Sequence, residues 1–181
     1  MTILVLLLVV LGAWAMIAFN RLVRLRNQVK TAWADIDVQL QRRHDLVPSL
    51  VAAVQAYAGH ESATLQAVSE LRAQALSQTQ PARLGEVEAS LEHELGRLVA
   101  LKESYPDLKA DRNFAQLQQE LVQVEEQLQY ARRFYNGAVR DYNDGTQRVP
   151  DALIARASGF GGAEFFQAGA GSRDAVKVQM Q

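Results

Sequence analysis

The sequence predicts an all-α protein in which an N-terminal transmembrane helix continues into an antiparallel four-helix bundle. An uncharged apolar run occupies residues 3–19, and a heptad pattern of apolar residues continues without a break from Phe114 to Tyr142. No segment of the bundle region alternates with period two, so no β-sheet is expected. The predicted domains are a transmembrane anchor over residues 1–20, the helical bundle over residues 21–149, and a C-terminal strap with a flexible tail over residues 150–181.

The composition excludes several classes of protein. The 181 residues carry a net charge of −1, so the chain lacks the basic field that attracts nucleic acid. It contains no cysteine, which excludes disulfides, thiolate nucleophiles, cysteine-ligated zinc and a lipoprotein-type anchor. A nucleic-acid partner is therefore not expected.

The apolar run of residues 3–19 is predicted to cross a membrane. Its length as a helix is roughly 26 Å, slightly less than a hydrocarbon core of ~30 Å. Arg21 and Arg24 can reach the headgroups and relieve this mismatch. A signal peptide is the alternative, with an Ala-Trp-Ala pattern at residues 13–15 in its favour. We prefer the retained anchor, because no basic segment precedes the run and a long helix follows it directly. The residues expected in the membrane are Ile3, Leu7, Leu11, Trp14 and Phe19.

The flanking charges predict the orientation of the anchor. No Lys or Arg precedes the apolar run, whereas Arg21, Arg24, Arg26 and Lys30 follow it before the first acidic residue, Asp35. The positive-inside rule then places the bundle on the cytoplasmic side of the membrane. A periplasmic bundle is the alternative.

Proline and glycine residues divide the domain into four helical segments. Residues 13–47 contain neither, so the membrane helix is expected to continue into the domain, to be kinked or restarted at Pro48, and to end near Ala58. The second and third helices are predicted over residues 60–78 and 82–104, and a turn follows. The fourth helix carries the heptad, whose seam residues are Phe114, Leu117, Leu121, Val124, Leu128, Ala131, Tyr135, Ala138 and Tyr142.

Two tyrosines of the fourth helix lie on one face, because Tyr135-Asn136 recurs as Tyr142-Asn143 after seven residues. We expect both rings in the core, with each hydroxyl bonded to a partner near the edge of the bundle. A binding face is the alternative. Asn136 and Asn143 lie one step from the seam, where contacts with the tail are expected.

The composition changes after Pro150. Five of the eleven glycines lie between Gly159 and Gly171, beside three phenylalanines. This part is predicted to be an irregular strap, frayed at its end, whose aromatic residues close the end of the bundle. Insertion of these residues into the membrane is the alternative. The phenylalanines concerned are Phe160, Phe165 and Phe166.

The sequence contains no motif for catalysis or for metal binding. None of the three histidines, His44, His60 and His93, has a second His at i+4 or a Glu at i−3. Phosphate-binding, dinucleotide-binding and nucleophile-elbow motifs are also absent. We therefore expect no enzyme, no cofactor and no small-molecule substrate.

A polar cluster interrupts the first helix over residues 35–48. The heptad from Leu22 continues through Gln39 and Arg43, which would form a buried polar layer if Arg43 paired with a carboxylate from another helix. The alternative is a stutter that moves the seam to Leu40 and Val47 and turns Arg43 to solvent. We favour the stutter, because the shifted seam is fully apolar. The candidate interaction residues are Asp35, Asp37, Gln39, Arg42, Arg43, Asp45, His60 and Glu61.

Three long segments of the chain together resemble the LemA family. They are residues 22–61, from "LVRLRNQVKTAWADIDVQ" to "YAGHE"; residues 105–121, "YPDLKADRNFAQLQQEL"; and residues 131–143, "ARRFYNGAVRDYN". The closing "GFGGAEFF" at residues 159–166 also resembles that family, whereas residues 77–85 do not match. The motif positions fall on Arg42, Arg43, Asp45, Tyr57, His60, Glu61, Tyr135, Asn136, Tyr142 and Asn143.

The resemblance implies a single-pass protein of the bacterial inner membrane, with a helical-bundle domain and no established enzymatic activity. That family includes a branch that is associated with magnetosome membranes. The expected function is a scaffold that contacts the bilayer, copies of itself or other membrane proteins. The glutamine-rich flank over residues 116–129 is either a face for self-packing or a solvated surface, and the solvated surface is favoured. A membrane-linked sensor with its site at Gln39 and Arg43 is the alternative function.

Overall fold

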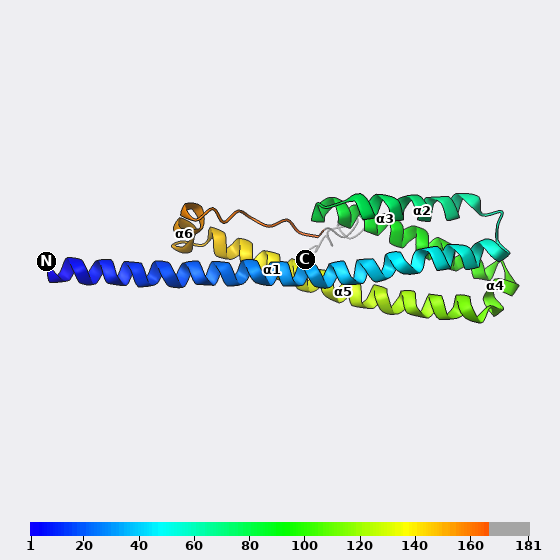
Figure 1. Ribbon diagram of the computed structural model, residues 1–181, viewed down its shortest axis with the longest axis horizontal. Helices are drawn as coiled ribbons and strands as arrows, with labels where there is room; N and C mark the ends of the chain where they lie inside the picture. Colours follow the sequence, from blue (N-terminus) through cyan, green and yellow to red (C-terminus); the bar gives the residue numbers. More distant parts are fainter. Residues whose placement is uncertain (167–181) are drawn as a thin grey trace, which may run out of the picture. The chain divides into compact units, whose positions relative to one another are not determined.

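The computed structural model describes residues 1–166, and all regular structure in this range is helical, which confirms the predicted class. Figure 1 shows the order of the elements. The helices are α1 (Thr2–Tyr57), α2 (Ser62–Ser77), α3 (Pro81–Ala100), the 3-10 turn η1 (Leu101–Glu103), α4 (Pro106–Ala110), α5 (Arg112–Gln147) and α6 (Asp151–Ala157).

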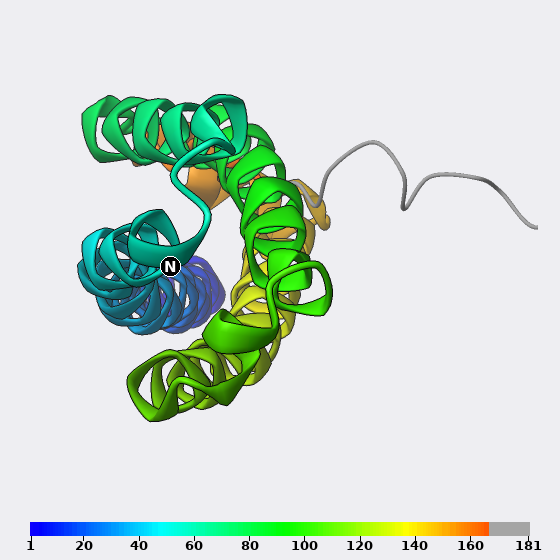
Figure 2. The same cartoon turned by 90° about the vertical axis from the view of Figure 1, so that its right-hand side faces the viewer.

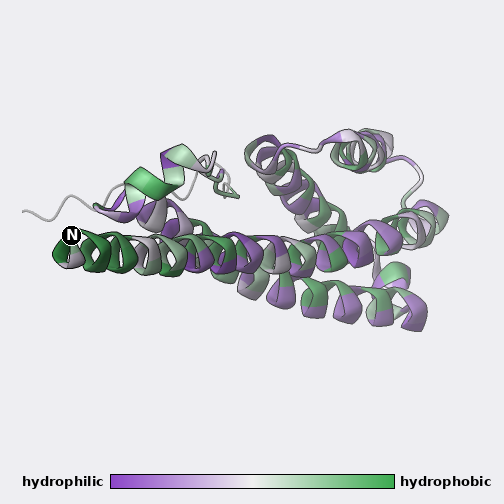
Figure 3. Cartoon of the chain, turned by 60° about the vertical axis from the view of Figure 1, so that its left-hand side comes forward, coloured by the Kyte–Doolittle hydropathy of each residue, from purple (hydrophilic) through white to green (hydrophobic). Residues whose placement is uncertain are grey.

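Helix α1 joins the apolar run to the rest of the chain without interruption, as the sequence predicted. Figure 3 shows the apolar run in green at the N-terminal end of α1. Pro48 lies inside this helix, so the expected restart at Pro48 is wrong. The missing N–H of Pro48 leaves the carbonyl of His44 without its usual helical donor. That carbonyl instead accepts a hydrogen bond from Nε of Arg72 on α2, at 2.8 Å.

The later helices begin where the sequence provides a suitable first turn. Pro81 and Pro106 begin α3 and α4, at the position where a missing N–H costs nothing. Asp111 precedes α5 and accepts a hydrogen bond from the backbone N–H of Phe114 at 2.8 Å, which caps that helix. The predicted turn after the third helix therefore contains a short helix, α4, that the sequence analysis did not identify.

The described chain forms two compact units. Unit 1 comprises Met1–Val38 and Leu128–Phe165, and unit 2 comprises Gln39–Gln127 together with Phe166. Each unit is described separately below. The domain limits predicted from the sequence differ from these bounds and remain a prediction.

Unit 2 contains a hydrophobic core to which five helices contribute. Helices α2 and α3 pack against each other within it, as Figure 2 shows. The core residues are Val47, Leu50, Val54 and Ala58 of α1, Leu65 and Val68 of α2, Leu91, Leu95 and Leu98 of α3, Leu108 of α4, and Phe114, Leu117 and Leu121 of α5.

Unit 1 is built by the first part of α1, the second part of α5 and the segment that contains α6. Its α1 and α5 segments approach closely at Gly145, where an added Cβ would lie 2.9 Å from Cδ1 of Leu25. All nine heptad residues of α5, from Phe114 in unit 2 to Tyr142 in unit 1, are buried. The segment after Pro150 is not wholly irregular as expected, because residues Asp151–Ala157 form α6. The predicted frayed end falls on residues 167–181, outside the described residues.

Candidate functional site

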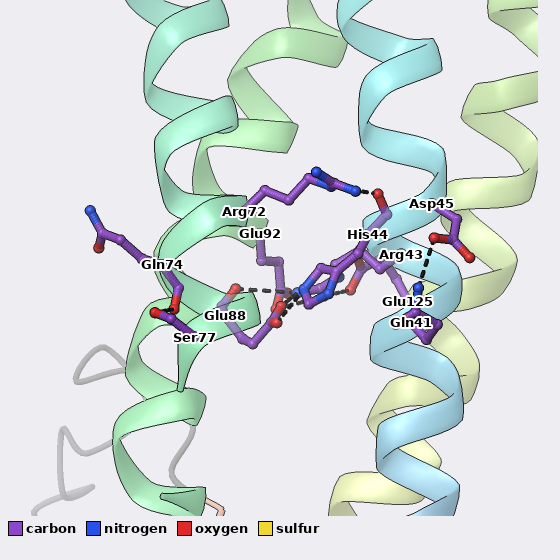
Figure 4. A network of polar contacts seen from close by, with 10 residues as sticks. All are labelled: Gln41, Arg43, His44, Asp45, Arg72, Gln74, Ser77, Glu88, Glu92 and Glu125. Atoms are coloured by element: carbon purple, nitrogen blue, oxygen red, sulfur yellow. Dashed lines mark hydrogen bonds and ion pairs between the residues drawn. The ribbon is translucent and has the colours of Figure 1, made fainter. Parts of the chain in front are cut away.

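A charged arginine lies inside unit 2. The side chain of Arg43 on α1 is 0% exposed, and Nη1 donates hydrogen bonds to Oε2 of Glu88 at 2.8 Å and to the main-chain oxygen of Glu88 at 3.2 Å. Nη2 pairs with the carboxylate of Glu125 on α5 and lies 3.7 Å from Oε2 of Glu92 on α3. Figure 4 shows these side chains converging from three helices. We call Arg43, His44, Glu88, Glu92 and Glu125 the polar layer.

Glu88 is the buried acceptor at the centre of the polar layer. Its side chain is 0% exposed, and its second oxygen, Oε1, lies 2.6 Å from Nε2 of His44. An ionised carboxylate only accepts hydrogen bonds, so in the tautomer that carries its proton on Nε2, His44 is the donor of this bond. Both oxygens of Glu88 are thus bonded, as a buried carboxylate requires. The other two carboxylates reach solvent, since the side chains of Glu92 and Glu125 are 42% and 22% exposed.

The interpretation that turned Arg43 to solvent is wrong. Leu40 and Val47 of the shifted seam are buried, as the stutter required, but Arg43 is buried as well. The physical reason is that Arg43 has partners on both α3 and α5, so the buried arc of α1 is wider here than a two-position seam. The polar layer was the less favoured alternative of the sequence analysis.

The acidic partners of Arg43 were not among the residues predicted from the sequence. Val87 of α3 is half-buried, whereas its neighbour Glu88 is buried. A signal for Glu88 was present, because Leu84, Glu88, Leu91, Leu95 and Leu98 step alternately by four and three residues. An acidic residue in such a series is a candidate partner for a seam arginine.

The other candidate residues of the first helix lie outside the polar layer. Asp35, Asp37, Arg42 and Asp45 are exposed, and Asp45 accepts a hydrogen bond from Nε2 of Gln41 at 2.8 Å. Gln39 is half-buried, and among the described residues its Oε1 has no hydrogen-bond partner. A groove of about 500 Å³ between α1 and α5 is lined by Gln39, Arg42, Asp45, Leu46, Glu120, Gln123, Val124, Glu126 and Gln127.

His60 and Glu61 lie in the connection between α1 and α2. His60 is exposed, whereas Glu61 is half-buried and accepts a hydrogen bond from the Tyr105 hydroxyl at 3.2 Å. The Tyr57 hydroxyl donates to Oδ2 of Asp111 at 2.8 Å, and this contact raises the pKa of Tyr57. The pKa of Asp111 is lowered by the backbone N–H of Phe114 and, next, by Tyr57. These contacts join helix ends within unit 2.

Unit 1 holds the tyrosine pair in its interior. Tyr135 is 3% exposed, and its hydroxyl donates to the backbone oxygen of Glu164 at 2.8 Å. Its ring packs against the ring of Trp33 in a T-shaped arrangement, with 5.3 Å between the ring centroids. Burial raises the pKa of Tyr135, and Glu164 raises it further. Tyr142 is 4% exposed, and burial raises its pKa as well.

Asn143 holds the strap after α6 against α5. Its Nδ2 donates to the backbone oxygen of Ala163 at 2.9 Å, and its Oδ1 accepts from the backbone N–H of Ala163 at 2.8 Å. Asn136 is half-buried. The three phenylalanines differ, because Phe160 is half-buried, Phe165 is 44% exposed and Phe166 is 1% exposed.

The arrangement of these groups fits structural pairing. No group of three or more His, Asp or Glu residues in the described part of the chain could hold a metal ion. In the polar layer, each oxygen of Glu88 and both terminal nitrogens of Arg43 are engaged with one another or with neighbouring side chains. Buried ionic groups of this kind fix the register of helices more than they add net stability.

Comparison with known proteins gives consistent matches. The sequence profile of the LemA family matches residues 32–180. Two proteins of Paramagnetospirillum magneticum, magnetosome protein MamQ 1 and magnetosome protein MamQ 2, are each 23% identical to the chain over 193 aligned positions. Each alignment covers 92% of this chain and 71% of the relative.

Proposed function

The chain belongs to the LemA family, and from this premise we propose that it is a non-enzymatic, membrane-anchored scaffold of the bacterial cell envelope that self-associates through its helical domain. Family membership and one N-terminal helix that is long and apolar enough to span a membrane indicate a membrane-associated protein. The scaffold activity, the self-association and the choice of membrane are the proposed part.

The exposure of the apolar run supports the anchor. Ile3, Leu7 and Leu11 are 82%, 52% and 50% exposed, and Phe19 is 42% exposed. Water-soluble proteins rarely expose an apolar surface this long, whereas a bilayer would cover it. Trp14 is half-buried. The positive residues that follow the run favour the cytoplasmic inner-membrane orientation over the periplasmic one.

One observation carries the proposal of self-association. Tyr130 and Phe134 lie one turn apart on α5 within unit 1, and they are 63% and 51% exposed. The guanidinium of Arg133 lies 4.7 Å from the centre of the Tyr130 ring. Tyrosine, phenylalanine and arginine are enriched in protein interfaces, and aromatic residues supply many of the strongest contacts there. We name Tyr130, Arg133 and Phe134 the aromatic face.

The proposed scaffold has the antiparallel four-helix arrangement expected from the sequence. The common core of α1, α2, α3 and α5 in unit 2 supports this arrangement. The short connections between α1 and α2 and between α2 and α3 also favour it, because helices joined by a few residues usually run antiparallel. The polar layer would then specify the register of α1 against α3 and α5.

A membrane-linked sensor is the second candidate function, and the polar layer favours it. Arg43 and His44 lie on α1, the helix that also contains the proposed anchor. A buried charged layer with two arrangements could couple a ligand in unit 2 to a shift of that helix. The groove beside Gln39 and Arg42 would be the ligand site.

The mass of the full-length protein in mild detergent tests the scaffold proposal. We expect light scattering to give a defined multi-copy particle, and the Tyr130→Ser/Phe134→Ser variant to give a smaller one because its apolar contact is lost. Leu76→Ser is the matched control, since Leu76 is an exposed apolar residue on α2, 52% exposed. A wild-type protein that stays monomeric at every concentration would contradict self-association and direct attention to the sensor.

A further inference from the structure

We propose that the segment of residues 148–160, which contains α6, makes a second contact with the membrane. In this proposal it lies in the headgroup region beside α1, with Val149 and Leu153 directed into the apolar boundary. We call residues 148–160 the α6 segment. The inference rests on the proposed anchor and deepens it, because it adds the lipid surface as a partner for a part of the chain distant in sequence.

Three contacts hold the α6 segment beside residues 19–26 of α1. Nη1 of Arg21 donates to Oδ2 of Asp151, the first residue of α6, at 3.1 Å. The rings of Phe160 and Phe19 pack in a T-shaped arrangement, with 5.6 Å between their centroids and an angle of 68° between their planes. The guanidinium of Arg26 lies 5.2 Å from the centre of the Phe160 ring.

The apolar run ends within this part of α1. Phe19 is the last residue of the run, and Arg21 is the first charged residue after it. A helix that spans the bilayer with residues 3–19 must leave the hydrocarbon at this point, where Arg21 and Arg24 can reach the headgroups. Figure 1 shows α6 beside this part of α1. The three contacts therefore hold the α6 segment at the membrane interface.

The end of α6 explains how Phe160 reaches Phe19. The backbone N–H of Phe160 donates to the oxygen of Ala155 at 2.9 Å, and that of Gly159 to the oxygen of Arg156 at 3.4 Å. This pair of bonds is a Schellman motif, and Gly159 adopts the positive φ of 70° that it requires. The chain thus reverses immediately after α6, and a residue with a Cβ at position 159 would be strained.

The two faces of the α6 segment differ in the way expected of an interfacial helix. Ala152 and Ala155 are buried inside unit 1. Val149, just before α6, and Leu153 are 79% and 63% exposed, and Leu153 shares a face of α6 with the exposed Arg156 because they are three residues apart. A helix that lies in the interface has apolar residues in the acyl boundary and basic residues at the headgroups.

The charged residues of the α6 segment and of the neighbouring part of α1 favour anionic headgroups. Residues 19–26 contribute Arg21, Arg24 and Arg26, and residues 148–160 contribute Arg148, Arg156 and the single acid Asp151. Five positive charges less one negative charge leave a net charge of +4 over these two stretches, and the exposed Asp144, next to the Gly145 that packs on Leu22 and Leu25, reduces it to +3. The phosphate groups of anionic lipids attract such a cluster within a Debye length of the surface. The partner that these residues fit is therefore an anionic lipid surface.

Site-specific fluorescence in vesicles tests the proposal, and the absence of cysteine from the chain makes single labels straightforward. The full-length variant Leu153→Cys would carry an environment-sensitive NBD label in vesicles of phosphatidylcholine and phosphatidylglycerol. Leu11→Cys marks the anchor. Val122→Cys marks an exposed apolar position on α5 of unit 2, 50% exposed. Lipids with a shallow doxyl group quench labels in the bilayer, and iodide quenches labels in water.

We expect doxyl quenching at position 153 to be several-fold stronger than at position 122, and to weaken when phosphatidylglycerol is omitted. If position 11 is quenched by doxyl lipid but position 153 responds only to iodide, as position 122 does, the inference is overturned and the anchor stands. If position 11 is also not quenched by doxyl lipid, the anchor proposal fails together with the inference.

Two further outcomes would count against parts of the proposal. Protection of position 153 from both quenchers, increasing with protein density, would assign this face to a second copy of the chain and overturn the lipid contact. Equal doxyl quenching with and without phosphatidylglycerol would overturn the selection of anionic headgroups, although the contact with lipid would stand.

Discussion

In unit 2, α1 buries the charged side chain of Arg43, whereas in unit 1 the same helix buries Leu22, Ala32 and Ile36. The partners of these two stretches also differ. The guanidinium of Arg43 meets carboxylates of α3 and α5. In unit 1, the Tyr135 hydroxyl makes a neutral hydrogen bond to the backbone oxygen of Glu164. The charged pair of Arg21 and Asp151 lies nearer the surface, where the side chain of Arg21 is 49% exposed.

The same helix therefore specifies its partners in two ways. A neutral hydrogen bond at the edge of a core adds modest stability and tolerates small shifts. A buried ion pair adds little net stability, but an incorrect register would leave a charge unpaired at a cost of several kcal/mol. The polar layer is therefore a device for specificity, and the tyrosine pair of unit 1 is chiefly a part of the apolar core.

The largest effect is expected for Glu88→Ala in the polar layer. This change leaves the buried guanidinium of Arg43 without its principal carboxylate, and it removes the acceptor of His44. We expect the free energy of unfolding to fall by about 3–5 kcal/mol. Urea unfolding of the full-length protein in detergent, followed by circular dichroism, measures this change. Glu86→Ala is the matched control, because Glu86 is an exposed residue on the same helix.

A double variant separates specificity from stability. Arg43→Met combined with Glu88→Leu removes both buried charges and retains similar volumes, so we expect it to recover most of the stability that Glu88→Ala loses. Equal, small losses for Glu88→Ala and Glu86→Ala would show that the polar layer is not desolvated. In that case the contrast between the two units would disappear.

The sequence predicted the helices well where one face alone decides burial. All nine heptad residues of α5 are buried, because a seam spaced by three and four residues has only one apolar side to turn inward. The tyrosine pair followed from the same pattern. Arg43 could not be placed in this way, since its burial depends on α3 and α5 flanking α1 at one level, and the pattern of α1 alone carries no information about them.

Two other features could not be predicted from the sequence pattern. Val87 and Glu88 both fit the helical repeat of the apolar residues of α3. Periodicity therefore could not show which of the two is buried. Helix α6 has seven residues, too few for a periodic signal, and its position depends on contacts with Arg21 and Phe19 far away in the sequence. Both are cases in which tertiary packing decides what local preference leaves open.

A smaller effect is expected for Arg72→Met, which removes the hydrogen bond to the neutral backbone carbonyl of His44. The carbonyl of His44 loses its donor, and Pro48 cannot replace it. We expect a loss of about 1–2 kcal/mol in the free energy of unfolding, measured by urea unfolding. In a Pro48→Ala background the helical N–H returns, so the same change should cost less. Arg83→Met on α3 is the exposed control, and an equal cost in both backgrounds would contradict this role of Arg72.

The smallest effect is expected in unit 1, where Tyr135→Phe keeps the buried ring and removes only the hydrogen bond to the backbone oxygen of Glu164. We expect a loss of about 1 kcal/mol in the free energy of unfolding at neutral pH. Tyr130→Phe is the control, because the ring of Tyr130 is 63% exposed.

The stability of this variant should also depend on pH in a different way from that of the wild type. Burial and the charge of Glu164 raise the pKa of Tyr135 above its ordinary value of 10.0, so the folded protein favours the neutral phenol. The contribution of a group with a raised pKa is fully present below its unfolded value and is lost as the pH rises through its folded value. The wild-type protein should therefore lose stability above about pH 10 more steeply than Tyr135→Phe does. Tyr142, whose pKa is also raised, keeps part of this slope in the variant. If wild type and Tyr135→Phe showed parallel curves above that pH, Tyr135 would be ionising in contact with water, and its surroundings would not be the closed, neutral site that contrasts with the polar layer.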